Sequence, residues 1–284
     1  MSLKRIQSLT ILIISILVFS GCHYDKILKS DDFDLKYENA KEYYNEGDYA
    51  RALPLLDQLL TVKIGTPDEK QIRYYMAYCY YGQGDFITAS GLFRQVFTIF
   101  PLTPEAEECL YMSANSLYTA SPRFELDQSI SYKAIDAFQY FLDVYPKSSL
   151  ADKANERVDI LRAKLEEKLI ASAELYYNTE NYLAAAVTYK NVLTLYPDTK
   201  DAEAINFKIL SSYFNYAGQS VTCRKEERYD MAINSYNDYL AKYPEGSELD
   251  EAKGLYDRSI DLKQKAINEI NTYKINCDEY TKKD

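Results

Sequence analysis

Residues Asn181–Pro197 read NYLAAAVTYKNVLTLYP and contain the pattern that recurs through the rest of the chain. The aromatic, small and large apolar residues of this segment lie at Tyr182, Ala185, Tyr189, Leu193 and Tyr196. Offsets of three, seven, eleven and fourteen positions lie on one face of an α-helix. The small alanine lets a second helix approach closely, and Pro197 ends the helix because proline cannot continue the hydrogen-bond ladder. The segment predicts one helix of a tightly packed pair.

The same template occurs four more times in the sequence. Its first positions are Tyr49, Phe86, Ser131, Tyr182 and Tyr229, with spacings of 37 to 51 residues. Repetition at this period indicates a solenoid of stacked helix pairs. The predicted pairs are 35–46 with 49–62, 68–83 with 86–100, 104–119 with 131–145, 148–178 with 182–196, and 200–217 with 228–243. A capping helix is expected at 247–276, and polar insertions are expected at 120–129 and 218–227.

The composition limits the classes of partner. The 284 residues include 27% charged side chains, the formal net charge is −10 and the pI is about 4.9. Nucleic acid is excluded as a partner because its phosphates need a basic surface. Tyrosine is unusually abundant, with 29 copies against no Trp and one His. Its apolar ring and polar tip suit both helix packing and binding surfaces.

The amino terminus has the features of a secretory signal. Lys4 and Arg5 precede an apolar run at 6–19, which is too short to span a bilayer comfortably. The segment Phe19-Ser20-Gly21-Cys22 resembles a bacterial lipobox, although Phe stands where Leu is usual. The resemblance implies cleavage before Cys22 and a lipid on its sulfur, with His23 giving no signal for inner-membrane retention. The alternatives are an uncleaved anchor and an ordinary signal with an incidental cysteine.

Four further cysteines are Cys79, Cys109, Cys223 and Cys277. A secreted protein meets an oxidising compartment, so disulfides are allowed, but the sequence leaves their pairing open. No CxxC spacing supports a zinc site. Cys79 lies among tyrosines in a predicted helix and is expected to pack as a small apolar residue.

The sequence has no recognisable arrangement of catalytic residues. The single His23 stands beside Cys22 in an expected tether, outside any element that would hold it as a general base. The chain has only nine glycines and no phosphate-binding loop. Adjacent glutamates such as Glu107 and Glu108 point about 100° apart on a helix and do not converge. We expect a binding protein without cofactor or metal, and not an enzyme.

The template resembles the tetratricopeptide repeat, which implies an all-α, right-handed superhelix of about five helix pairs with a carboxyl-terminal capping helix. The first-helix half of the motif is matched by three pairs: Ala40 and Tyr43, Ala77 and Tyr80, and Ala173 and Tyr176. Together with the lipobox, the Ser121-Pro122-Arg123 insertion and the segment 133–138, the five repeats resemble the BamD family of outer-membrane lipoproteins.

The resemblance implies a lipid-anchored scaffold in the machine that assembles outer-membrane β-barrels, at the periplasmic face of the outer membrane. Residues 1–21 are then the signal peptide, 22–34 the tether, 35–147 repeats one to three, and 148–284 repeats four and five with the capping helix. The carboxyl-terminal repeats would dock the BamA-type barrel subunit. The amino-terminal repeats would receive the carboxyl-terminal signal of unfolded outer-membrane proteins.

The residues themselves show a regular row of tyrosines on the first three first helices. Relative to Ala40, Ala77 and Ala114, a tyrosine stands three residues before and four residues after each alanine. These six residues are Tyr37, Tyr44, Tyr74, Tyr81, Tyr111 and Tyr118. Two tyrosines seven residues apart share one face of a helix, so the row is expected to line an apolar groove for an extended peptide. The alternative is that the tyrosines pack between adjacent repeats and only rim the groove.

Later repeats replace the row with Ile170 and Tyr177, then Phe207 and Phe214, which fits a different partner. A surface lipoprotein that binds glycan or peptidoglycan is the second function considered. Such sites usually use Trp platforms, and the chain has no Trp.

Overall fold

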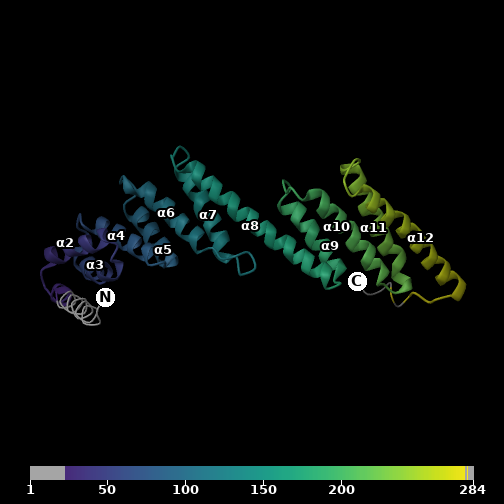
Figure 1. The fold of residues 1–284 in the computed structure, drawn as a ribbon, viewed down its shortest axis with the longest axis horizontal. Coiled ribbons are helices and arrows are strands. Elements are labelled where there is room, and N and C mark those ends of the chain that lie inside the picture. The colour runs from purple at the N-terminus through teal and green to yellow at the C-terminus, as the bar shows by residue number, and fades with distance from the viewer. Residues whose placement is uncertain (1–22, 279, 281–284) are drawn as a thin grey trace, which may run out of the picture. The chain divides into compact units, whose positions relative to one another are not determined.

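The computed structural model describes residues 23–278 and residue 280, and every regular element in that part of the chain is helical. Helices follow one another along the chain and are joined by short turns (Figure 1). Their bounds are α2 (Phe33–Asn45), α3 (Tyr49–Lys63), α4 (Glu69–Gly82), α5 (Phe86–Ile99), α6 (Glu105–Ala120), α7 (Ser129–Val144), α8 (Ala151–Asn178), α9 (Tyr182–Leu195), α10 (Ala202–Gly218), α11 (Thr222–Lys242) and α12 (Leu249–Tyr273). The predicted helix pairs are confirmed, with most ends within three residues of the prediction.

The chain divides into two compact units after Leu161. The boundary falls inside α8, so the first part of this helix packs with α6 and α7 and its later part packs with α9 and α10. Unit 1 therefore holds the first three helix pairs, and unit 2 holds the later pairs with α12. The predicted division at 147–148 lies just before α8 begins.

Tight turns in unit 1 follow from the Gly-Asp steps of the repeat. Gly47 and Gly84 have φ of 76° and 82°, a conformation that glycine adopts without a Cβ clash. The next residue in each case caps the following helix: Asp48 accepts a hydrogen bond from the Arg51 backbone N–H, and Asp85 from that of Thr88. The chain thus reverses in two residues and brings the paired helices together.

The small positions of the template are where the helices approach most closely. Ala40, Ala77 and Ala114 have no solvent exposure, and each lies in the core of unit 1. The second helices supply the large apolar partners, such as Leu56, Phe93 and Phe138, which are also fully buried. Burying large side chains against small ones gives each pair a continuous core with its neighbours.

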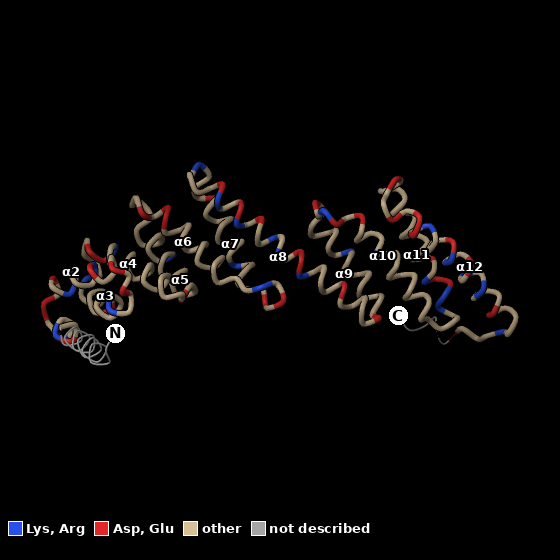
Figure 2. The backbone as a smooth tube through the Cα atoms, in the orientation of Figure 1, with Lys and Arg blue, Asp and Glu red and all other residues tan. Residues whose placement is uncertain are grey.

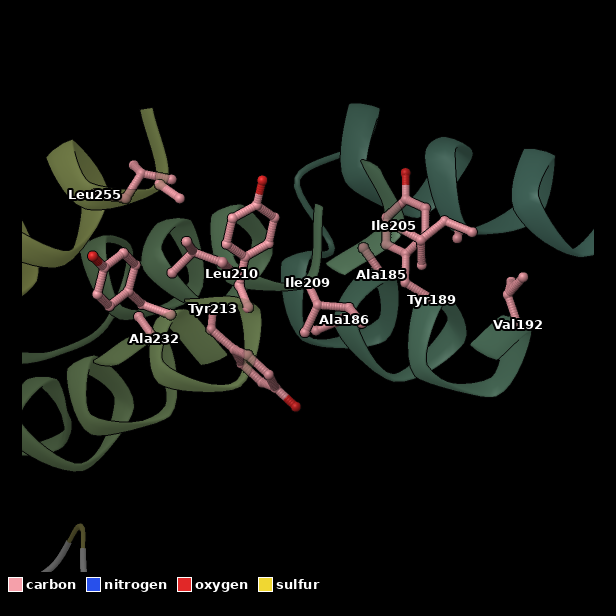
Figure 3. Packing of buried hydrophobic residues seen from close by; sticks show 14 residues of the cluster. Ala185, Ala186, Tyr189, Val192, Ile205, Ile209, Leu210, Tyr213, Ala232 and Leu255 are labelled. Atoms are coloured by element: carbon pink, nitrogen blue, oxygen red, sulfur yellow. The ribbon is translucent and has the colours of Figure 1, made fainter. Parts of the chain in front are cut away.

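Unit 2 builds its core largely from tyrosine. Tyr189, Tyr213, Tyr236 and Tyr239 are at most 7% exposed and pack with Ala185 and Ala232. Figure 3 shows Tyr189 and Tyr213 among the aliphatic side chains of α9 and α10. The Tyr239 hydroxyl donates to a Glu203 carboxylate oxygen at 2.8 Å, so its polar end is paired.

Two predicted irregular segments differ in the structure. Residues 23–28 form a helical turn in place of a free tether, with Ile27 buried and the Tyr24 hydroxyl donating to the Arg51 carbonyl at 3.2 Å. The apolar Ile27 drives this packing. In the predicted insertion at 218–227, α11 begins already at Thr222, so only residues 219–221 leave the helices. The insertion at 120–129 is confirmed as a loop between α6 and α7.

One disulfide joins Cys223, at the start of α11, to Cys277, beyond the end of α12. Cys79 and Cys109 are free and fully buried, which confirms the expected packing role of Cys79. The predicted signal peptide and the lipidation residue Cys22 lie outside the described residues. Within the part of the chain that the structure describes, no helix has the length and apolarity needed to cross a bilayer.

Candidate partner-binding face of unit 1

The six predicted tyrosines lie on α2, α4 and α6, the first helices of unit 1. Five of them are half-buried, with part of each side chain open to solvent. We call these five the tyrosine face: Tyr37, Tyr44, Tyr74, Tyr81 and Tyr118.

Tyr111 is not part of that face, which corrects its assignment to the groove. It is only 4% exposed, because α7 places Phe138 and Phe141 against its ring at centroid distances of 5.8 and 5.5 Å. The seven-residue spacing within a helix gave no information about these partners on α7.

Three members of the tyrosine face join neighbouring first helices. The Tyr44 ring of α2 stacks near Tyr75 of α4, with centroids 4.4 Å apart. The Tyr81 hydroxyl accepts a hydrogen bond from Asn115 Nδ2 at 3.2 Å, and the Tyr118 hydroxyl accepts one from Arg157 Nη1 at 2.7 Å. These three tyrosines therefore pack between adjacent repeats, which is the alternative role that the sequence left open for them.

The equivalent position makes the same kind of contact in unit 2. The Tyr177 hydroxyl accepts from Asn215 Nδ2 at 3.0 Å and shares a 2.8 Å hydrogen bond with Ser211. The Phe214 ring lies under the Arg258 guanidinium at 5.0 Å. In each of the five described repeats, the aromatic residue four positions after the buried apolar residue of the first helix (Ala40, Ala77, Ala114, Ala173 or Leu210, here called the anchor) thus contacts the next first helix.

Tyr74 and Tyr78 of α4 share one acceptor on α6. Both hydroxyls donate to the carboxylate of Glu108, with Tyr74 at 3.2 Å from Oε2. Burial, followed by the negative charge of Glu108, raises the pKa of Tyr74 to about 12. Burial and the hydrogen bond to Glu108 raise the pKa of Tyr78 as well. Both hydroxyls therefore stay protonated at physiological pH and are already occupied as donors.

Tyr81 and Tyr118 differ from Tyr74 because they accept their hydrogen bonds. A phenol that accepts still has its own O–H hydrogen to donate. These two half-buried side chains therefore combine an apolar ring, an oriented oxygen and a free donor. Such a combination fits the carbonyl groups and apolar side chains of a bound peptide.

The sequence pattern did not reveal the partners that orient these tyrosines. Asn115 follows its anchor Ala114 directly, and Ser211 follows the anchor Leu210 in the same way. Each lies 34 residues after the tyrosine that it contacts. Glu108 also lies 34 residues after Tyr74, so this shared offset is the signal that identifies all three contacts. Arg157 lies 39 residues after Tyr118 and does not share the offset.

Charges of both signs are interspersed along each unit (Figure 2). The described residues contain no group of three or more His, Cys, Asp and Glu side chains that could hold a metal ion. Burial raises the pKa of the free thiols of Cys79 and Cys109 to about 12, so both stay protonated.

Stacked helix pairs with half-exposed aromatic residues on their first helices define a helical-repeat protein. The family described as YfiO, outer membrane lipoprotein, matches residues 31–220, and the chain belongs to this family, that of the BamD lipoproteins. No curated protein matches the sequence.

Two solved structures show similar helical arrangements. The TPR domain of P58(IPK) is 15% identical with a TM-score of 0.40, covering 85% of this chain and 68% of that one. The TPR2AB domain of yeast Sti1, from a complex with pHSP90, is 12% identical with a TM-score of 0.38, covering 80% and 98%.

Proposed function

We propose that the protein is a lipid-anchored scaffold subunit of the outer-membrane β-barrel assembly machine. Unit 2 docks a BamA-type barrel subunit, and the tyrosine face of unit 1 receives the carboxyl-terminal segments of unfolded outer-membrane proteins. The family supports an outer-membrane lipoprotein built from helical repeats. The observation that carries the substrate role is the set of half-exposed tyrosines repeated on α2, α4 and α6.

The residues on the first helices differ between unit 1 and unit 2, and this difference supports a different partner for each unit. The positions equivalent to Tyr37 and Tyr74 are Ile170 and Phe207 in unit 2, and both pack against its core. Unit 2 therefore lacks the first row of hydroxyls that unit 1 carries. A barrel signal that ends in aromatic residues matches a surface of rings and donors better than a purely apolar one.

A lipid anchor on Cys22 is compatible with substrate binding by unit 1. The helical residues 23–28 follow Cys22 directly in the sequence, and Ile27 is buried against the first repeat. Acyl chains on Cys22 would hold unit 1 close to the periplasmic surface of the outer membrane. The scaffold acts by binding and positioning its partners and not by catalysis.

Co-purification from the native envelope tests the docking role. The lipoprotein is extracted in mild detergent and its bound proteins are identified. We expect a large outer-membrane barrel with periplasmic domains in amounts comparable to the lipoprotein. Recovery of glycan-handling proteins, with no such barrel, would contradict the assembly role and favour the glycan-binding function.

A further inference from the structure

The disulfide of unit 2 closes the open end of its last helix pair. Helices α11 and α12 lie side by side and are joined by the turn at 243–248 (Figure 1). Cys223 lies at the start of α11 and Cys277 lies just beyond the end of α12, so their bond is at the end of the pair away from the turn. The cross-link therefore holds together the two helix ends that the turn does not connect.

The buried side chains of α11 and α12 are concentrated toward the turn that joins them. In α11 the buried side chains begin at Tyr229, and in α12 they end at Ala266. Residues 222–228 and 267–273, all of them described, are exposed or only partly buried. Little apolar burial therefore stabilises the end of the pair at which the disulfide lies.

The start of α11 and the end of α12 differ in what else holds them. The start of α11 is fixed by Arg228, whose guanidinium lies over the Tyr216 ring at 4.1 Å and whose Nη1 donates to Ser220 Oγ at 2.7 Å. In the last turns of α12 the aliphatic side chains are Ile267 and Ile270, and both are only partly buried. A helix end with so little apolar burial opens locally at a low cost in free energy. Loss of the disulfide should therefore release the end of α12 more than the start of α11.

The end of α12 also presents a surface that a partner can contact. The Tyr273 side chain is 75% exposed, and tyrosine is enriched at protein interfaces. Gln264, Asn268 and Thr272 are exposed on the same part of α12 and form one open surface with Tyr273. This surface is continuous only while the end of α12 stays helical.

The disulfide is open to thiol exchange. Cys223 and Cys277 are both partly exposed, whereas the free cysteines Cys79 and Cys109 are fully buried. A thiolate of a dithiol reductant attacks one sulfur, forms a mixed disulfide and releases the other cysteine as a thiol. The second thiol of the reductant then displaces the remaining cysteine. Cys223 and Cys277 gain two electrons and two protons, and the reductant leaves as its own disulfide.

We propose that the Cys223–Cys277 bond is a redox latch that controls docking by unit 2, an inference that rests on the proposed docking role. In the oxidised protein the latch holds the end of α12 beside α11. Reduction by a dithiol protein of the thioredoxin class frees this segment, and the barrel subunit must then order it again on docking. A partner that binds only the ordered form loses apparent affinity in proportion to the ordered fraction. Oxidation thus makes unit 2 competent for docking.

Amide hydrogen exchange tests the structural part of the proposal. The full mature lipoprotein in detergent is compared in its oxidised form and after reduction with dithiothreitol. Exchange in residues 267–273 should become at least about tenfold faster on reduction, with a smaller change in 222–228 and none in unit 1. Cys277→Ser should exchange like the reduced protein in both conditions. Cys109→Ala is the control, because it removes a buried free cysteine and keeps the disulfide, so its α12 should still respond to reduction.

Binding of the barrel subunit tests the functional part. The barrel subunit that co-purifies with the lipoprotein is the probe, and biolayer interferometry gives its dissociation constant. The reduced lipoprotein is alkylated and freed of dithiothreitol first, so that the probe itself is not reduced. We expect the reduced protein and Cys277→Ser to bind about tenfold more weakly than the oxidised protein, as for an ordered fraction of about one tenth.

The two measurements separate the latch from the docking role. Unchanged exchange in residues 267–273 on reduction would overturn the latch. Faster exchange with an unchanged dissociation constant would overturn its control of docking. If the oxidised wild-type protein fails to bind the barrel subunit, the docking role itself is wrong, and with it the control of docking, while hydrogen exchange still decides whether the disulfide holds the end of α12.

Discussion

Tyrosine serves this chain both in the core and on the candidate binding face because the ring is apolar and the hydroxyl is polar. Tyr189 and Tyr239 are almost fully buried in unit 2, whereas Tyr81 and Tyr118 are half-buried on the first helices of unit 1. The difference lies in the neighbouring helices and not in the residue type.

The repeat template predicted which positions are small and which are aromatic. It failed at Tyr111, where Phe138 and Phe141 from α7 cover a position that its helical spacing placed on the surface. It also missed Arg157, because helical spacing within α6 carries no information about which α8 side chain reaches Tyr118. Such contacts depend on how helices pack across repeats.

Two glycines in unit 1 give a matched pair of stability predictions. A Cβ at Gly82, the last residue of α4, would lie 1.9 Å from the Tyr49 ring, so Gly82→Ala should lower the free energy of unfolding by about 1–3 kcal/mol. A Cβ at Gly91 within α5 would meet nothing within 4 Å. Gly91→Ala should therefore raise the free energy of unfolding by about 0.5–1 kcal/mol, as alanine favours helix.

Urea denaturation followed by circular dichroism measures both variants. Each substitution removes the same backbone freedom from the unfolded chain, so the difference between them reports the collision with Tyr49. Stabilisation by both substitutions would show that the Tyr49 ring moves aside at little cost.

Among the elements, helix ends were predicted best where turn residues have one physical role. Gly47 and Gly84 supply positive φ, and the aspartates after them cap the next helix. The start of α11 was placed six residues late, because the polar segment from Thr222 to Glu227 has no apolar period of its own. Its helix is fixed by the disulfide at Cys223 and by Arg228, whose guanidinium lies over the Tyr216 ring.

The disulfide is expected to stabilise the end of unit 2. It joins residues 54 positions apart and ties the segment after α12 to α11. Reduction, or Cys223→Ser, should lower the free energy of unfolding by about 2–4 kcal/mol, since the cross-link restricts the unfolded chain. Chemical denaturation with and without dithiothreitol measures the loss, and amide hydrogen exchange should localise it to α11 and α12.

Cys223→Ser supplies the control for this prediction. The variant should show no further loss on reduction, because Cys79 and Cys109 are already free. Equal stability of the oxidised and reduced wild-type protein would contradict a stabilising role for the cross-link.

At the scale of the whole molecule, the proposed assignment of substrate binding to unit 1 and of barrel-subunit docking to unit 2 follows from a solenoid whose repeats differ in sequence. Each repeat contacts mainly its neighbours, so one end can change its first-helix residues without disturbing the other. Unit 1 keeps tyrosines where unit 2 has Ile170 and Phe207. The sequence was sufficient to predict the helix pairs, the family and five of the six half-exposed tyrosine positions, with Tyr111 as the exception. It was not sufficient to predict the residue within α8 at which the packing unit changes, since that helix reads as one continuous segment.

Site-specific photo-crosslinking in the native envelope tests the central claim most directly. A photoreactive phenylalanine analogue replaces Tyr81 on α4 or, as a control, the exposed Gln139 on α7, a second helix. The account predicts crosslinks from position 81 to newly made, unfolded outer-membrane proteins and none from position 139. Equal crosslinking at both positions, or none at position 81 in a protein that still folds and reaches the membrane, would contradict a substrate-binding tyrosine face.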